Sequence, residues 1–259
     1  MTEALDRTML NKVPLVTLAF WIIKIMATTV GETGADFLNM QLGLGLTTTS
    51  LIMAAALAIF LAIQMRKARY VPWIYWMVVV FLSVVGTLLT DNLSDNFGVS
   101  LYVSTAAFAV ALMITFIAWY RSEHTLSIHA ITTTRREAYY WAAILFTFAL
   151  GTAAGDLVAE QFGLGYVTAG LIFGGAIAAI TLGYYGFGLN SVLAFWFAYI
   201  LTRPLGASIG DWLIQSRVNG GLELGLMPVN GVFAVVIVGL VIYLSQRHDT
   251  AAPAARERA

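Results

Sequence analysis

Four aspartates recur at matching places along the chain and are the first candidates for chemistry. Each lies fifteen residues after a tryptophan, in the pairs Trp21 and Asp36, Trp76 and Asp91, Trp141 and Asp156, and Trp196 and Asp211. Carboxylates that gather inside a membrane bind a cation, share protons or are neutralised by Lys and Arg. If the chain crosses a membrane and its helices surround one axis, these aspartates predict a cation-binding or proton-exchanging site.

Charged residues also occur deeper in two of these segments. Glu32 lies one helical turn before Asp36, and Lys24 lies two turns before Glu32. Arg203 lies eight residues before the fourth aspartate. A charge deep in a membrane-spanning helix is costly and usually functional. We therefore expect Glu32 and Thr28 to bind an ion together with the aspartates, and we expect both cations to act as charge partners or coupling groups.

Metal ligands in this chain must be oxygen atoms or His nitrogens, because the sequence contains no Cys. The metal ligands that we expect are Glu32 and the four aspartates, since carboxylate oxygens suit hard divalent cations. The aspartates also have a structural interpretation, in which they end helices at the membrane surface and pair with Lys24, Arg203 or water. Both interpretations stay open for the aspartates, whereas the depth of Glu32 and Lys24 favours function.

The composition indicates a membrane protein. Hydrophobic residues make up 59% of the 259 residues and charged residues only 11%, which excludes a soluble domain of this size. The charges cluster at the termini and in short gaps, so there is no basic face for nucleic acid. Apolar runs of about 20 residues are long enough to cross a bilayer as helices. Eight such runs lie near residues 14–35, 46–65, 71–91, 99–120, 138–157, 166–187, 191–212 and 227–246.

The gaps between these runs alternate in charge. The second gap, the fourth gap and the tail after the last run hold Arg66, Lys67, Arg69, Arg121, Arg135, Arg136, Arg247, Arg256 and Arg258. The first, third and fifth gaps hold no Lys or Arg, and Arg217 in the seventh gap is the exception. By the positive-inside rule, both termini are cytoplasmic. We expect a cytoplasmic segment at 1–12, one transmembrane domain at 13–247 and a disordered cytoplasmic tail at 248–259.

The tryptophans and aspartates belong to an internal repeat of two helices. Its four units cover about 13–69, 70–121, 138–187 and 190–247. A glycine lies five residues before each aspartate, at Gly31, Gly86, Gly151 and Gly206, and predicts close helix approach. Because each unit has two helices, all four insert the same way up. An all-α membrane fold of eight helices in four parallel units is predicted, with a pseudosymmetry axis along the membrane normal.

One face of each unit's first helix carries the repeated residues. At 100° per residue, the positions fifteen, eight and four before each aspartate share a face with it. This face is more polar than its surroundings in three units, so we expect it to point into the bundle. Each tryptophan lies about 22 Å from its aspartate, toward the cytoplasm. There we expect it to pack or to anchor the helix, because interfacial tryptophans commonly do so.

With four two-helix units and a characteristic tryptophan in each, the chain resembles a bacterial multi-pass membrane family built from four tandem copies of a repeat of unknown function. The resemblance covers residues 15–243. It implies the fold and a location in the bacterial inner membrane, and no activity. The fourth unit departs from the pattern through a longer gap at 216–226.

Enzyme signatures are missing from the sequence, which has no intramembrane His, no Gly-x-Ser-x-Gly and no phosphate-binding loop. We expect neither an enzyme nor a cofactor. The prediction is a membrane transporter of a small inorganic cation, proton-linked or passive, with a divalent metal preferred. A non-transporting scaffold or sensor with structural aspartates, and an exporter of a small organic compound, are the alternatives. The expected partners are the lipid bilayer and the cation or proton, without nucleic acid, and a homo-oligomer is left open.

Overall fold

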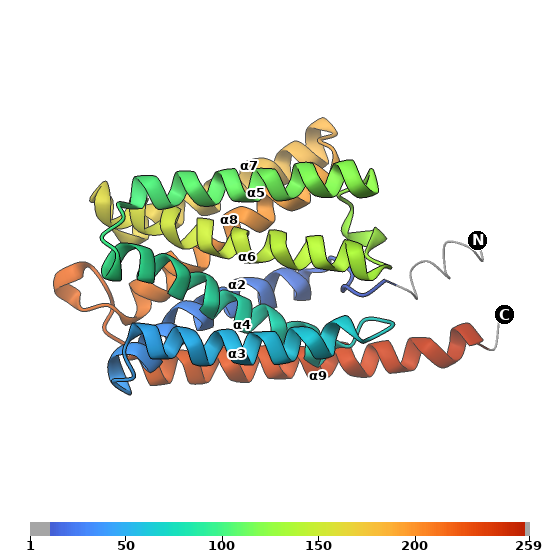
Figure 1. Ribbon diagram of the computed structural model, residues 1–259, viewed down its shortest axis with the longest axis horizontal. Coiled ribbons are helices and arrows are strands. Elements are labelled where there is room, and N and C mark those ends of the chain that lie inside the picture. The colour runs from blue at the N-terminus through green and yellow to red at the C-terminus, as the bar shows by residue number, and fades with distance from the viewer. Residues whose placement is uncertain (1–10, 257–259) are drawn as a thin grey trace.

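The computed structural model describes residues 11–256, with side chains for residues 11–246 (Figure 1). That part of the chain forms eight α-helices and no β-strand. The helices are α2 (Leu18–Asp36), α3 (Leu46–Met65), α4 (Pro72–Asp91), α5 (Leu101–Glu123), α6 (Thr134–Asp156), α7 (Gly165–Phe187), α8 (Ser191–Ile214) and α9 (Leu226–Arg256). Each begins within about one turn of an apolar run found in the sequence. The all-helical prediction is therefore confirmed.

Among the described residues, seven helices are long and apolar enough to cross a membrane, which indicates a multi-pass membrane protein. The exception is α2, in which Lys24, Glu32 and Asp36 lower the hydropathy. The chain was expected to be disordered from residue 248, but α9 continues as a helix through Arg256. Residues 1–10 of the predicted N-terminal segment and residues 257–259 of the predicted tail lie outside the described residues.

The helices form two layers. Helices α2, α4, α6 and α8 contact one another in a closed ring, in which α8 returns to α2. The outer helices α3, α5, α7 and α9 pack on α4, α6, α8 and α2. Figure 1 shows α3 and α9 along one edge of the molecule and α5 and α7 along the opposite edge. The second helix of each unit thus covers the first helix of the next unit, and the last helix returns to the first unit.

The repeated glycines lie where neighbouring inner helices touch. A Cβ atom added at Gly206 would lie 2.7 Å from Cβ of Thr28 and 3.0 Å from the carbonyl oxygen of Ile25. The other three glycines meet the next inner helix at the equivalent position, with Gly31 on Ser83, Gly86 on Phe148 and Gly151 on Arg203. A side chain at any of these positions would overlap the neighbouring helix. The close helix approach predicted from the glycines is therefore confirmed.

Paired aromatic residues near the start of the inner helices form a closed belt, here called the collar. It consists of Phe20, Trp21, Tyr75, Trp76, Tyr140, Trp141, Phe195 and Trp196. The first aromatic ring of each unit contacts the tryptophan of the next. The centroid distances are 5.6 Å for Phe20 and Trp76, 5.3 Å for Tyr75 and Trp141, 6.2 Å for Tyr140 and Trp196, and 5.7 Å for Phe195 and Trp21. Since aromatic rings attract at these distances, the collar joins all four units.

The opposite end of the inner ring, here called the acidic end, carries the repeated aspartates. In three units the α-helix ends at the aspartate and continues as a π-helix: η1 (Phe37–Gln41), η2 (Asn92–Asn96) and η4 (Leu157–Gln161). π-Helical turns are rare and are often found at functional sites. In the fourth unit α8 instead runs past Asp211 to Ile214. The departure of the fourth unit, expected from its longer gap, is therefore confirmed.

Candidate functional site

A buried ion pair lies inside the inner ring. Arg203 on α8 is fully buried, and its Nη2 lies 2.5 Å from Oε2 of Glu32 on α2. Glu32 itself is 8% exposed. The sequence had indicated charged residues at this depth without showing which of them pair. The structure gives Arg203 a glutamate, and not an aspartate, as its partner.

Polar groups from the other inner helices surround this pair. The Thr87 hydroxyl on α4 donates to Oε2 of Glu32 at 3.1 Å and also contacts Nη2 of Arg203. On α6, Oγ1 of Thr152 accepts a hydrogen bond from Nη2 at 2.7 Å. The carbonyl oxygen of Thr28 accepts one from Nη1 at 2.9 Å. All four inner helices thus contribute to one cluster, here called the polar centre: Thr28, Glu32, Thr87, Thr152 and Arg203.

The polar centre uses the inward face that the sequence predicted. Glu32, Thr87 and Thr152 all lie four residues before the aspartate of their unit, and all are buried. The prediction that this face points into the bundle is therefore confirmed. Thr28, expected to bind an ion through its hydroxyl, instead donates that hydroxyl to the carbonyl oxygen of Lys24 at 2.5 Å. Such back-bonding is common for Thr in helices, and only the Thr28 carbonyl reaches the centre.

Lys24 is fully buried and lies two turns along α2 from Glu32. Its Nζ lies 4.2 Å from the ring centroid of Phe148 and 4.3 Å from that of Tyr199. It makes no hydrogen bond to any other residue that the structure describes. Aromatic faces attract a cation, but they neither accept its protons as an oxygen does nor neutralise its charge. Lys24 is thus a buried amine that faces two aromatic rings and has no anionic partner among the residues that the structure describes.

The repeated aspartates lie at the acidic end of the inner ring, one on each inner helix. Asp36, Asp91 and Asp156 are half-buried, and Asp211 is 9% exposed. Their charges interact with one another and with Glu32. None of the four forms an ion pair with a described Lys or Arg, although the structural interpretation had expected such pairs. In the part of the chain that the structure describes, no three Asp, Glu or His side chains are grouped as metal ligands.

The repeated tryptophans pack within the collar. Trp76, Trp141 and Trp196 are at most 4% exposed, and Trp21 is half-buried. The indole Nε1 of Trp196 donates to the carbonyl oxygen of Leu126 at 2.9 Å. The prediction that these residues pack is confirmed, and their partners are other aromatic rings of the protein.

A second buried ion pair, which we did not predict, lies next to the collar. Nζ of Lys12 lies 2.6 Å from Oε2 of Glu137. Oε1 of Glu137 accepts hydrogen bonds from Gln64 at 2.9 Å and from Trp141 at 3.4 Å. The sequence signal was an acid one turn before a repeated tryptophan, on the same helix face. The structure shows that this acid, Glu137, is fully buried. This pair ties the N-terminal segment to α3 and α6 at the collar end.

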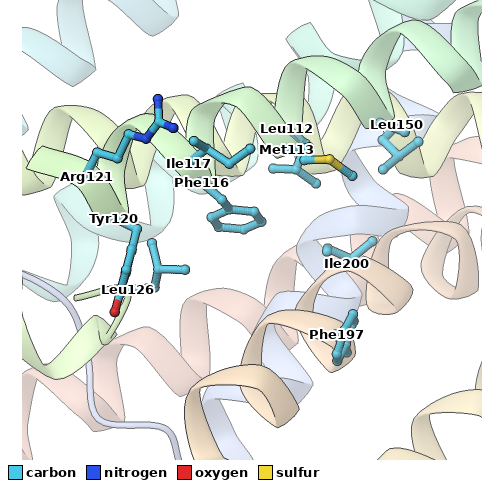
Figure 2. A pocket seen from close by; sticks show the side chains of 11 residues that line it. Leu112, Met113, Phe116, Ile117, Tyr120, Arg121, Leu126, Leu150, Phe197 and Ile200 are labelled. Atoms are coloured by element: carbon cyan, nitrogen blue, oxygen red, sulfur yellow. The ribbon is translucent and has the colours of Figure 1, made fainter. Parts of the chain in front are cut away.

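Two grooves open on the outside of the inner ring. One of about 480 Å³, between α5, α6 and α8, is lined by apolar side chains such as Phe116 and Phe197, with Tyr120 and Arg121 at one end (Figure 2). The other, of about 790 Å³, lies between α2, α7, α8 and the loop at 126–129. None of the ion-binding residues predicted from the sequence lines either groove.

Seven apolar helices and a fourfold repeat define a multi-pass membrane protein built from tandem two-helix units. The chain belongs to the family described as Repeat of Unknown Function (DUF347), whose model matches residues 19–70, 74–125, 139–188 and 194–249. The resemblance and the four-copy repeat are therefore confirmed. No curated protein and no solved structure matches the chain.

Proposed function

We propose that the protein transports a small inorganic cation through the inner ring, between the acidic end and the collar. In this proposal all eight helices cross the membrane, and α2 does so because its charges face the other inner helices. The four units are parallel and related by a pseudosymmetry axis along the membrane normal. The repeated glycine and aromatic contacts support this axis, since each unit meets the next in the same way.

The proposed orientation places the collar end at the cytoplasm of a bacterial inner membrane. The collar lies near the start of the inner helices, next to the gaps that hold Arg66, Lys67, Arg69, Arg121, Arg135 and Arg136. Basic residues in short loops favour the cytoplasmic side. The aspartates then face the outside, where their negative charges attract cations from solution.

The polar centre carries the proposal. A buried ion pair seldom adds stability over apolar packing, because both charges lose their hydration. Here the Arg203 guanidinium is bound by a carboxylate and by threonine oxygens, a ligand set that also suits a small cation. An entering cation competes with Arg203 for Glu32, and a proton on Glu32 weakens the pair as well. Displacement of Arg203 thus couples cation or proton arrival to rearrangement of the inner helices.

The ligand chemistry sets the proposed class of cation. Glu32, the aspartates and the threonines offer only oxygen atoms, which suit hard cations such as Mg²⁺, Ca²⁺ or Mn²⁺. We place a divalent metal ahead of a monovalent ion because the carboxylates at the acidic end interact electrostatically with one another, and a doubly charged ion is attracted more strongly to such a set of charges. Transport is proton-linked if Glu32 or Asp36 exchanges its proton during the cycle, and passive if neither does.

The test is ion uptake into liposomes that contain the purified protein, measured for protons and for several divalent metals. Glu32→Gln and Asp36→Asn are compared with the wild type. Each removes a charge at the proposed path, and we expect uptake to fall about tenfold or more. Asp95→Asn is the matched control, because Asp95 lies at the same end but is exposed and is not one of the four repeated aspartates. Equal uptake by all four proteins would overturn the proposal.

The scaffold alternative has its own outcome in the same experiment. If no ion enters the liposomes, if ions leave the thermal stability unchanged and if Asp36→Asn lowers it, the aspartates are structural. A transported cation that binds the folded protein must instead raise the apparent stability. Thermal unfolding in detergent, with and without each ion, therefore separates the two functions.

Export of a small organic compound is a second candidate, favoured by the larger groove. Its volume of about 790 Å³ is in the range of sites for small organic ligands. Trp21, Phe195 and Tyr184 line it together with His129. Ala198→Trp would fill this groove, and efflux of a fluorescent amphipathic dye should then stop while Glu32→Gln leaves it unchanged. Dye efflux that Ala198→Trp leaves intact would rule this candidate out.

A further inference from the structure

The smaller of the two grooves lies on the outer, apolar surface of the helical bundle. One side of it is formed by α5, and the other by side chains that include Leu150 of α6 and Phe197 of α8 (Figure 2). Helix α5 is long and apolar enough to cross a membrane. Met113 and Phe197 in this groove are exposed large apolar side chains. In a membrane, such a surface meets the hydrocarbon chains of lipids.

The length of the smaller groove matches one leaflet of a bilayer. Its α5 residues run from Ala109 to Arg121, and these twelve positions rise about 18 Å along a helix. The hydrocarbon core of a bilayer is about 30 Å thick, so one leaflet contributes about 15 Å. An acyl chain that lies parallel to α5 therefore spans the groove from end to end.

The polar residues of the smaller groove are both at one end. Tyr120 and Arg121 lie in the last turn of α5, and the other lining residues are apolar. Figure 2 shows the Tyr120 hydroxyl and the Arg121 guanidinium at the same end of the groove. Tyr is enriched where membrane helices reach the lipid headgroups. A guanidinium binds phosphate oxygens through two parallel N–H groups.

The charge of Arg121 is not used by the described part of the protein. Arg121 is exposed and forms no ion pair with any residue that the structure describes. Glu123, two positions further on, is paired with two other arginines. Its carboxylate lies 2.8 Å from Nε of Arg136 and 3.5 Å from Nε of Arg135. Arg121 can therefore bind an anion at the polar end of the groove.

We propose that the smaller groove binds a phospholipid with an anionic headgroup, whose acyl chain lies along α5 and whose headgroup contacts Arg121. Contact with the chain gives little selection, because all lipid tails are as apolar as the groove. Selection comes from the headgroup, since basic residues between membrane helices attract anionic lipids. This inference goes beyond the proposed function, because it holds whether or not ions cross the inner ring.

The larger groove lies at the equivalent place one unit later and has no such cation. The smaller groove lies between the outer helix α5 and the inner helices α6 and α8, and the larger lies between the outer helix α7 and the inner helices α8 and α2. No described Lys or Arg lines the larger groove. The residue that matches Arg121 in the third unit is Gly186, at the same separation as Trp76 and Trp141. Selection by charge is therefore expected only in the smaller groove.

The experiment measures lipid binding to the purified full chain in a neutral detergent. Phosphatidylglycerol and phosphatidylcholine with the same acyl chains are added separately, and native mass spectrometry counts the lipids bound at each concentration. We expect the wild type to bind phosphatidylglycerol about fivefold more tightly, the effect of one basic residue near an anionic lipid. Arg121→Gln should remove this preference, and Arg121→Lys should keep it.

Arg66→Gln is the matched control for the lost charge. Arg66 follows α3 at the position of the first unit that matches Arg121, is exposed, and lines neither groove. This variant should prefer phosphatidylglycerol as strongly as the wild type does.

A second pair of variants tests the groove itself. Ala109→Trp places a large ring in the groove at the end away from Arg121, and binding of both lipids should fall. Ala107→Trp is its control, because Ala107 is exposed on the opposite face of α5. Thermal unfolding without lipid shows whether each variant is folded. Bound phosphatidylglycerol should raise the unfolding temperature of the wild type more than phosphatidylcholine does.

Each outcome supports or overturns the lipid site. An equal loss of preference in Arg121→Gln and Arg66→Gln would overturn it, because surface charge in general would then attract the lipid. Lipid binding that Ala109→Trp leaves unchanged would also overturn it. If inorganic phosphate at the same ionic strength stabilises the wild type as much as phosphatidylglycerol does, the ligand is a free anion and not a lipid. A lipid-free dimer that Ala109→Trp dissociates would instead assign the groove to a second copy of the chain. Ion uptake is measured separately, so failure of the lipid site leaves the proposed function standing.

Discussion

The collar and the acidic end are repeated with the same regularity in the sequence but are built differently in the structure. In the collar each unit contacts the next through aromatic rings, and Trp76 is only 2% exposed. At the acidic end the aspartates are half-buried or nearly buried, and none forms an ion pair with a described residue. The repeated tryptophans thus have packing partners within the protein. The repeated aspartates have no charge partner among the described residues and can still bind a cation.

This difference shows that the presence of a residue in every unit does not by itself reveal what the residue does. A residue found in every unit meets the same geometric requirement four times, but only its partners show whether that requirement is packing or binding. Between the two ends, the polar centre breaks the repeat. Equivalent positions hold Glu32, Thr87, Thr152 and Ala207. A single ion pair needs one acid and one base, so four units that share one centre cannot be identical there.

The largest loss of stability should come from the collar. Trp76→Ala removes a buried ring that contacts Phe20 and Tyr75, and we expect the free energy of unfolding to fall by about 4 kcal/mol. Trp73→Ala is the control, because Trp73 lies one turn earlier on α4 and is 53% exposed. Denaturant unfolding in detergent measures both variants. Equal losses would remove the distinction between collar and surface tryptophans.

The next largest effect should come from the polar centre. Arg203→Met leaves Glu32 buried without its cation, so we expect a loss of about 3 kcal/mol. The double variant with Glu32→Gln removes both charges and should recover most of that loss. The same unfolding measurement tests both proteins. Losses that simply add in the double variant would show that the two side chains are not energetically coupled.

Helix contact through the repeated glycines should have an intermediate effect. Gly206→Ala places a methyl group against Thr28 and Ile25, and we expect a loss of about 2 kcal/mol from overpacking. Gly175→Ala on α7 is the matched control, because no atom lies within 4 Å of its added Cβ. That variant should be neutral or more stable, since Ala favours helix. Similar stability of the two variants would contradict the closed inner ring.

The smallest effect on stability should come from the acidic end. Asp156→Asn breaks no ion pair with a described residue. It removes a carboxylate that interacts unfavourably with Glu32 and favourably with Arg203, so these two effects oppose each other. We expect its free energy of unfolding to stay within about 0.5 kcal/mol of the wild type or to rise. A loss as large as that of Trp76→Ala would mean that the aspartates and tryptophans share a structural role.

Most of the fold could be predicted from the sequence, because it depends on local patterns. Span length follows from hydropathy, and the repeat and its inward face follow from spacing that any helix preserves. The π-helices after Asp36, Asp91 and Asp156 were not predicted, because hydropathy and residue spacing do not distinguish a π-helical turn from an α-helical one. The helical course of α9 through Arg256 was also missed, because the Ala- and charge-rich tail resembles a disordered segment.

The candidate site could be predicted only in part. The depth of Glu32 and Arg203 was readable from the sequence, but their pairing was not, since it depends on how α2 and α8 meet at the closure of the ring. The pair of Lys12 and Glu137 joins residues 125 positions apart, and no local pattern links them. Lys24 was expected to be a charge partner or a coupling group. Its aromatic neighbours, Phe148 and Tyr199, could not be predicted because they come from helices far along the chain.

The most direct test of the account is cation uptake by Asp156→Asn in liposomes, measured beside its thermal stability. The account predicts that uptake falls about tenfold or more relative to the wild type, while the protein remains as stable as the wild type. That result would assign the unpaired aspartates to cation transport. Wild-type uptake by the equally stable variant would contradict the account, because the acidic end would then have no part in transport.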